Sequence, residues 1–213
     1  LTFVTGNKKK LEEVRAILGS SFPFKVVSRS VDLPELQGAD PEVVSREKCR
    51  LAAQEVSHAA DGLSAWLTHK HAVIGMFLWN CALSCRVCNT VHWMCSQWFL
   101  EKLGHEGLNN MLTAYEDKSA YAQCIFALSL GPGDEPVVFA GRCPGKIVPA
   151  RGKLDFGWDP VFMPDGHEGT FAEIPSDVKN TISHRFRSLN MLREYVSTHR
   201  DEIAVRMSSS GVK

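Results

Sequence analysis

Acidic residues are absent from one long stretch of the chain. Positions 62–97 contain no aspartate or glutamate, although the whole sequence has 24 of them. The same stretch carries Trp66, Trp79 and Trp93, four of the seven cysteines and three of the eight histidines. Neither a helical nor a strand period persists through it. We therefore expect this segment to be locally inconsistent with the rest of the chain.

Several classes of protein are excluded by what else is missing. The 24 basic and 24 acidic residues balance, so no broad basic face for duplex nucleic acid is expected. The longest apolar run, around positions 72–83, contains Asn80 and is too short to span a bilayer. No secretory leader pattern is visible, and an odd number of cysteines without framework spacing favours reduced thiols. We expect a cytoplasmic protein without membrane or nucleic-acid partners.

The first eighteen residues predict a strand that leads into a helix. Positions 1–5 are apolar and β-branched, and Gly6 and Asn7 tolerate the positive φ of a tight turn. Lys8, Lys9 and Lys10 then begin a helix with one apolar face. Lysine in a first turn opposes the helix dipole, so the pattern indicates a bound anion. A solvated basic turn remains the alternative.

A loop and a second long helix follow a short strand at 24–28. Pro34 and Gly38 indicate that 31–38 is a loop, with Glu35 as its central carboxylate. Asp40 and Pro41 are typical of a helix start, and this helix should run to about Val56. Lys48 lies on or beside its inward face, where it either extends to solvent or meets an anion in a cleft. The sequence alone favours extension to solvent.

A zinc site is one interpretation of the cysteines in the acid-free stretch. Cys85, Cys88, His92 and Cys95 are ligand types for zinc. They fall within one short span, without the well-separated second pair of zinc ribbons and fingers. Buried or free thiols are the favoured interpretation.

The second half of the chain predicts a mixture of helices and strands, ending in a polar tail. The expected elements are helices at 98–103 and 107–115, strands at 120–130, 137–140 and 145–148, a helix at 176–196, and a frayed tail over 198–213.

Two clusters in this half are candidate binding residues. Phe156, Gly157, Trp158 and Asp159 place two aromatic rings and a carboxylate in a tight turn, which suits stacking on a purine and hydrogen bonding to its edge. Core aromatics with a turn aspartate are the alternative.

The last predicted helix carries the second cluster on the flank of its apolar stripe. Lys179 and Ser183 are four residues apart and so are neighbours on a helix, with His184 and Arg185 beside them. A solvated basic flank is the ordinary interpretation of such a pattern. Because this basic flank lies next to the Pro/Gly-rich region that carries the aromatic turn, a binding role is the alternative.

Five motifs in this order resemble the inosine triphosphate pyrophosphatase (Ham1-like) family. The resemblance covers about 1–56 and 97–195 and is specific. Its motifs are Thr5-Gly-Asn-Lys-Lys-Lys10, Asp32-Leu-Pro-Glu35, Lys48, Phe156-Gly-Trp-Asp159 and Lys179-Asn-x-x-Ser-His-Arg185.

The resemblance implies a fold and an activity. The implied fold is α/β, two-lobed, with a long central mixed β-sheet flanked by helices and a nucleotide cleft between the lobes, as a single domain over 1–197. The implied activity is hydrolysis of non-standard purine nucleotides (ITP, dITP, XTP) to the monophosphate and pyrophosphate. It also implies a homodimer and Mg²⁺, with Mn²⁺ as the alternative ion.

The resemblance also implies residue roles. The triphosphate would be held by Thr5, Gly6, Asn7, Lys8, Lys9 and Lys10, and its charge would be neutralised by Lys48 and Lys179. The base and sugar would be bound by Phe156, Gly157, Trp158 and Asp159, and the 6-oxo edge of the purine would be contacted by His184 and Arg185. Glu35 would ligate Mg²⁺.

The chain departs from the family pattern over about 58–97. The family has a metal-binding aspartate in an Asp-Ser/Thr-Gly-Leu turn there, and Asp61-Gly62-Leu63 is the only remnant. Gln97 replaces a cationic residue of the family. We therefore expect binding residues to be present and catalysis to be impaired. The alternatives are a nucleotide-binding isoform or dimer partner of an intact enzyme, a zinc-containing interaction module, and a chain that does not fold.

Overall fold

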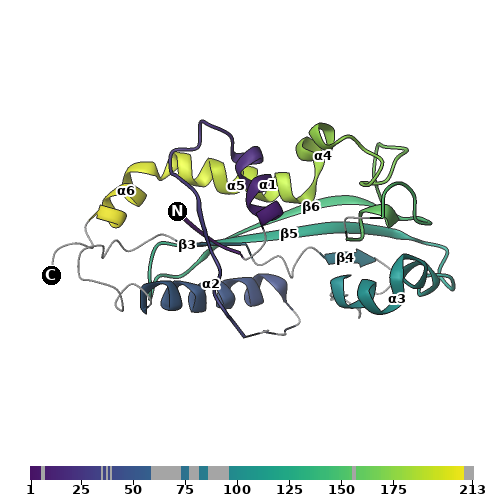
Figure 1. Ribbon diagram of the computed structural model, residues 1–213, viewed down its shortest axis with the longest axis horizontal. Helices are drawn as coiled ribbons and strands as arrows, with labels where there is room; N and C mark the ends of the chain where they lie inside the picture. The colour runs from purple at the N-terminus through teal and green to yellow at the C-terminus, as the bar shows by residue number, and fades with distance from the viewer. Residues whose placement is uncertain are drawn as a thin grey trace. The chain divides into compact units, whose positions relative to one another are not determined.

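The computed structural model describes residues 1–5, 8–34, 36, 38, 40–58, 73–76, 82–85, 96–154 and 157–208 (Figure 1). The chain forms two compact units. Unit 1 comprises Leu1–Phe77, Ile125–Ala140 and Ser188–Lys213, and unit 2 comprises Leu78–Cys124 and Gly141–Arg187. The prediction of one domain over 1–197 stays a prediction.

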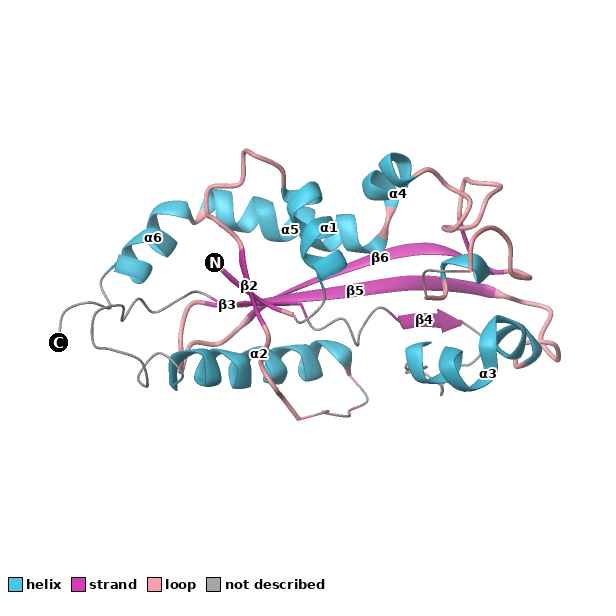
Figure 2. Ribbon diagram, in the orientation of Figure 1, coloured by secondary structure: helices cyan, strands magenta, loops and turns pink. Residues whose placement is uncertain are grey.

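Both units contain helices and strands (Figures 1 and 2). Unit 1 contains β1 (Thr2–Val4), α1 (Lys8–Leu18), β2 (Val27–Arg29), α2 (Pro41–His58), β3 (Val73–Met76) and α6 (Arg200–Ser208). Unit 2 contains β4 (Ala82–Cys85), α3 (Ser96–Asn110), the 3₁₀ turn η2 (Asp159–Val161), β7 (Phe162–Pro164) and α4 (Ser176–Ile182). Three elements contribute residues to both units: β5 (Ser119–Ser129), β6 (Val137–Ile147) and α5 (His184–Thr198).

The strands pair in both directions, so the expectation of a mixed sheet is confirmed. In unit 1, β1 pairs in parallel with β2 and β3, and β3 pairs antiparallel with β5. In unit 2, β5 pairs antiparallel with β4, and β6 pairs antiparallel with β7. β5 and β6 are neighbours and contain eleven residues each. The chain is a mixed α/β protein.

The core of unit 1 follows from the two-residue period of its strands. Val4 and Ala127 lie in one cluster with Cys49, Ala53 and other residues of α2. Their neighbours Phe3 and Phe126 bring their ring centroids to 6.4 Å from each other. Because successive side chains point to opposite faces of a strand, α2 covers only one face. α5 lies on the other side in Figure 2.

Two predicted helix starts are confirmed by the structure. α1 begins at Lys8, and α2 begins at Pro41. The Asp40 carboxylate accepts a hydrogen bond of 2.8 Å from the backbone N–H of Glu42, which is the contact expected of an N-cap aspartate. Short-range chemistry therefore sets the beginning of α2.

Some predicted boundaries are wrong. The strands expected at 137–140 and 145–148 are one continuous strand, β6. The helix expected at 176–196 breaks at Ser183, which is extended and separates α4 from α5. Residues 200–208 form α6 rather than a frayed tail, and its Ile203 is fully buried. The helix expected at 107–115 ends at Asn110, as the last segment of α3.

Most of the acid-free stretch lies outside the described residues. Within it, β3, β4 and the first two residues of α3 are described. Cys88, His92 and Cys95, three of the four zinc-ligand candidates, lie outside, as does Asp61. Among the residues that are described, no helix is long and apolar enough to cross a bilayer.

Gly145 in β6 packs directly against the backbone of β7. A Cβ atom at this position would come within 2.4 Å of the carbonyl oxygen of Met163 and 2.9 Å of the Cα atom of Pro164. We expect Gly145→Ala to lower the free energy of unfolding by about 1–3 kcal/mol, because overpacking against backbone atoms forces the strands apart. Chemical denaturation measures this change.

Gly131 provides the matched control for that variant. A Cβ atom there would meet nothing closer than Asp134, at 3.9 Å. Gly131→Ala should therefore leave the free energy of unfolding unchanged, or raise it by about 0.4–1 kcal/mol through the unfolded chain. Equal stability of the two alanine variants would contradict the close packing of β6 on β7.

Candidate functional site

A cluster of four aromatic rings forms in unit 2. Trp158 lies edge-on to Phe162, with ring centroids 5.7 Å apart, and 6.3 Å from Phe171. The His184 ring lies 5.3 Å from Trp158 and 5.9 Å from Phe171, stacked on the latter at 28°. The structure thus brings two sequence-predicted residues, Trp158 and His184, into contact.

Asp159 and Lys179 form a buried ion pair beside these rings. The Lys179 ammonium donates a hydrogen bond to Oδ2 of Asp159. It also lies 5.3 Å from the centre of the Phe171 ring, which is a cation–π arrangement. Asp159 is only 5% exposed, and its pair with Lys179 links η2 to α4.

Burial dominates the electrostatics of Asp159. Loss of water contact raises the pKa of its carboxyl above the ordinary value, and the charge of Lys179 opposes this shift most strongly. His184 and Arg185 also act to lower this pKa, by smaller amounts. The cationic groups around Asp159 therefore offset only part of the cost of burying its charge.

Ser183 explains how Lys179 and His184 reach the same cluster from two helices. Its backbone N–H donates to the carbonyl oxygen of Lys179, which completes the last turn of α4. Its hydroxyl accepts a hydrogen bond of 3.1 Å from the backbone N–H of Phe186, which caps α5. The predicted single helix is wrong here because a serine cap starts a new one.

His184 is the most unusual residue of the cluster. Its side chain is only 1% exposed, and within the described part of the chain neither ring nitrogen has a hydrogen-bond partner. A buried polar group without a partner costs free energy, so a native site that keeps one has capacity for a ligand. The neighbouring Arg185 is also buried.

Five further predicted site residues that are described belong to unit 1. Thr5 follows β1, and its backbone N–H donates to the carbonyl oxygen of Arg29 at 2.9 Å. Lys8, Lys9 and Lys10 form the first turn of α1. Lys48 in α2 is 3% exposed, so the prediction that it extends to solvent is wrong.

Several predicted site residues lie outside the described ranges. These are Gly6, Asn7, Glu35 and Phe156. Gly157 is described and has a φ of +52°, the left-handed backbone conformation expected of the turn. The motifs missed two residues of the cluster, Phe162 and Phe171, because single phenylalanines carry no spacing signal.

The described residues do not fit a metal centre. Among them, no group of three or more histidine, cysteine, aspartate or glutamate side chains is placed to hold an ion. Asp159, the carboxylate of the aromatic cluster, is already paired with Lys179.

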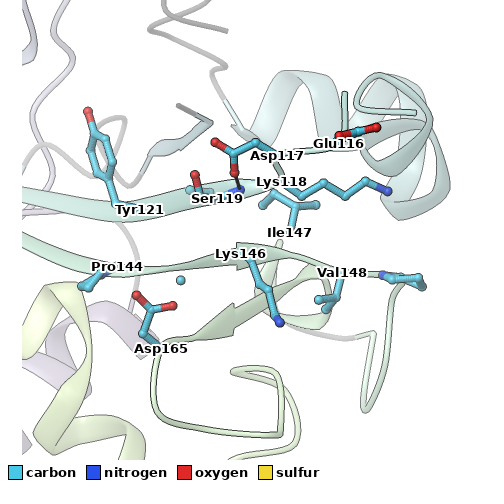
Figure 3. Close-up of a pocket in the computed structure, with 13 residues that line it drawn as sticks. Glu116, Asp117, Lys118, Ser119, Tyr121, Pro144, Lys146, Ile147, Val148 and Asp165 are labelled. Carbon is cyan, nitrogen blue, oxygen red and sulfur yellow. Dashed lines mark hydrogen bonds between the residues drawn. The ribbon is translucent and has the colours of Figure 1, made fainter. Parts of the chain in front are cut away.

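A separate cavity of about 550 Å³ lies in unit 2 (Figure 3). β5, β6 and the segments beside them supply most of its lining, and Asp165 follows β7. Its charged residues carry both signs, so the cavity favours no single class of ligand. They are Glu116, Asp117, Lys118, Lys146 and Asp165.

The fold and the cluster of Trp158, Asp159, Lys179 and His184 define a mixed α/β protein with a buried site of aromatic and ionisable side chains. A model of the Ham1 family matches residues 1–195 of the chain, which therefore belongs to this family.

Solved structures of bacterial proteins share the fold. A Ham1 protein from Coxiella burnetii has a TM-score of 0.74 at 22% identity, over 92% of this chain and 98% of the other. The Staphylococcus aureus Ham1 protein has a TM-score of 0.67 at 24% identity, over 92% and 97%. A Mycobacterium abscessus protein described as a nucleoside-triphosphatase and dITP/XTP pyrophosphatase has a TM-score of 0.64 at 26% identity, over 90% and 97%.

Proposed function

We propose that this protein is a nucleoside triphosphate pyrophosphohydrolase that hydrolyses ITP, dITP and XTP to the monophosphate and pyrophosphate. Membership of the Ham1 family supports the proposal. So does the likeness to the Mycobacterium abscessus protein, which is described as acting on dITP and XTP. The observation that carries it is the buried imidazole of His184, without hydrogen-bond partners among the described residues and stacked on Phe171.

The two basic residues at the start of α5 suit a 6-oxopurine. A guanidinium such as that of Arg185 only donates hydrogen bonds, and a purine 6-oxo group only accepts them. The imidazole of His184 adds a further donor, and in its neutral form an acceptor for the N1–H group. An adenine 6-amino group would set donor against donor at Arg185, which leaves buried groups unpaired. We therefore expect the site to bind ITP more tightly than ATP.

The proposed reaction is attack of water on the α-phosphorus. A new P–O bond forms between the water oxygen and the α-phosphorus, the bond from the α-phosphorus to the bridging oxygen breaks, that oxygen leaves as part of pyrophosphate, and the proton of the water passes to the solvent. The lysines assigned to the triphosphate, including Lys48 and Lys179, would neutralise its charge. Mg²⁺, or Mn²⁺, remains part of the proposal, with Glu35 as carboxylate, because Mg²⁺ typically binds one or two carboxylates together with substrate phosphates.

A second candidate function is nucleotide binding with impaired catalysis. It is favoured by the loss of the family's aspartate turn, since Asp61-Gly62-Leu63 lacks the hydroxyl residue. Assembly as a homodimer and a cytoplasmic location are part of either proposal. In this form the chain could act as the dimer partner of an intact enzyme.

Pyrophosphate release from ITP and from ATP, with and without Mg²⁺, separates these possibilities. We expect release from ITP in the presence of Mg²⁺ and about a hundredfold less from ATP, because a buried group left unpaired costs about 1–3 kcal/mol. Calorimetric binding of ITP without pyrophosphate release would support the impaired form. A protein that neither binds nor hydrolyses ITP would refute both.

A further inference from the structure

α3 in unit 2 is broken at Gly104. This residue has φ of 67° and ψ of −178°, a conformation open only to glycine. His105 is therefore the first residue of the second segment of the helix, and its carbonyl oxygen accepts a hydrogen bond of 3.2 Å from the side-chain amide of Asn109. The break sets the direction in which His105 leaves the helix.

The imidazole of His105 reaches the turn that carries the aromatic site. Its Nε2 atom lies 2.8 Å from the carbonyl oxygen of Gly157. A carbonyl oxygen only accepts hydrogen bonds, so Nε2 must carry the hydrogen. The bond joins positions 52 residues apart in the sequence, and η2 also lies against α3 in unit 2.

The space on the Cβ side of Gly157 is open. This residue has a φ of +52°, and a Cβ atom built there would find no atom within 4 Å. The hydrogen bond from His105 therefore restrains the Gly157 peptide, which has no packing on its Cβ side. Trp158 and Asp159 follow directly, so the Gly157 peptide is where the backbone enters the aromatic cluster and the ion pair.

We propose that His105 is a positioning residue for the nucleotide site, because its hydrogen bond to Gly157 holds the turn that presents Trp158 and Asp159. This inference rests on the proposed function. His105 does not touch the nucleotide in this scheme. It acts by keeping the turn in the conformation that binds, so that less ordering is required when the nucleotide arrives.

The test compares His105→Ala and His105→Gln with the unaltered protein. Glutamine keeps a side-chain N–H donor, and alanine has none. In the nucleotide-free protein, we expect His105→Ala to speed amide hydrogen exchange in peptides that cover 157–161. With ITP, we expect the KM to rise about fivefold, the equivalent of one ordinary hydrogen bond, with kcat changed less than about twofold. His105→Gln should have an exchange rate at 157–161 and a KM for ITP close to those of the unaltered protein.

His167→Ala is the matched control, because His167 is a half-buried histidine of unit 2 outside the site. It should leave the KM for ITP and the exchange of 157–161 unchanged. A His105→Ala protein with unaltered exchange and KM would overturn the inference. So would an equal loss in both His105 variants together with a lower melting temperature, since that marks a general structural role.

Gly104→Ala tests the same hydrogen bond by changing the backbone of α3 next to His105. Alanine strains this backbone conformation, although a Cβ atom at Gly104 would contact nothing within 4 Å. We expect the variant to reproduce the faster exchange at 157–161. If the unaltered protein shows no binding of ITP, the proposed function fails. Faster exchange in His105→Ala would then still establish the anchor of the turn, and the nucleotide role alone would be overturned.

Discussion

Replacing His184 with phenylalanine is expected to separate stability from function. Phenylalanine retains a ring next to Trp158 and Phe171 and removes two buried nitrogen atoms that have no hydrogen-bond partner in the described chain. Removal of unpaired buried polar groups is neutral or stabilising. The melting temperature of His184→Phe should therefore equal or exceed that of the unaltered protein.

The same variant should be a poor enzyme. A 6-oxo group left unpaired in a buried site costs about 1–3 kcal/mol, which corresponds to a loss of about 5- to 150-fold in kcat/KM for ITP. The ratio of kcat/KM for ITP to that for ATP should fall as well. Steady-state assays of pyrophosphate release with both nucleotides measure these quantities.

His199→Phe is the control for this experiment. The ring of His199 also stacks on an aromatic side chain, with its centroid 4.2 Å from that of Tyr195. Its Nδ1 atom has a hydrogen-bond contact with the carbonyl oxygen of Tyr195, so it lacks the unsatisfied character of His184. His199→Phe should leave kcat/KM unaltered. If His184→Phe kept full activity and selectivity, the assignment of the base site would be wrong.

Local patterns predicted the elements whose ends are set by local chemistry. The strand β1 and the lysines that begin α1 lie close together in the chain, and Asp40 caps α2 through an amide two residues away. Such contacts depend on a few consecutive residues, so a single sequence carries them.

Elements that depend on distant partners could not be predicted in this way. Separate strands were expected at 137–140 and 145–148, yet β6 is continuous, and β7 pairs with it at Gly145, Lys146 and Ile147. α6 contains one fully buried apolar residue, Ile203, too weak a pattern to distinguish it from a tail. In both places tertiary packing outweighs local preference.

The candidate site shows the same division. The family motifs identified Trp158, Asp159, Lys179 and His184, but no motif states that Asp159 pairs with a lysine 20 residues away. Lys48 was expected to extend to solvent because burying an ammonium group costs free energy. Its burial depends on tertiary surroundings that no local pattern contains.

The Asp159–Lys179 pair supports the second prediction. Lys179→Met should lower the free energy of unfolding by about 3–5 kcal/mol at neutral pH, because it leaves a buried carboxylate without its counter-charge. Asp159 and Lys179 have side chains that are 8% and 14% exposed, so solvent screens the pair only weakly. Denaturation by urea measures the change.

The loss should shrink in acid. Burial already raises the pKa of Asp159 in the folded protein, and Lys179 is the main group that opposes this shift. Removing the lysine raises that pKa further. A carboxyl with a raised folded-state pKa is stabilising where it is protonated and loses that contribution as the pH rises through its pKa. The difference between Lys179→Met and the unaltered protein should therefore be largest at about pH 7 and smaller at about pH 4.5.

The double variant Asp159→Leu/Lys179→Met decides whether the ion pair itself is the cause. With both charges gone, no buried carboxylate remains, and apolar side chains of similar size often replace such a pair without loss. The free energy of unfolding of the double variant at neutral pH should equal or exceed that of the unaltered protein, and it should lack the pH dependence of the single variant. ITP hydrolysis should stay low, because the proposed phosphate-binding lysine is missing. A double variant as unstable as Lys179→Met, or a single variant whose loss is the same at both pH values, would show that packing of the lysine stem, rather than compensation of the Asp159 charge, stabilises this part of unit 2.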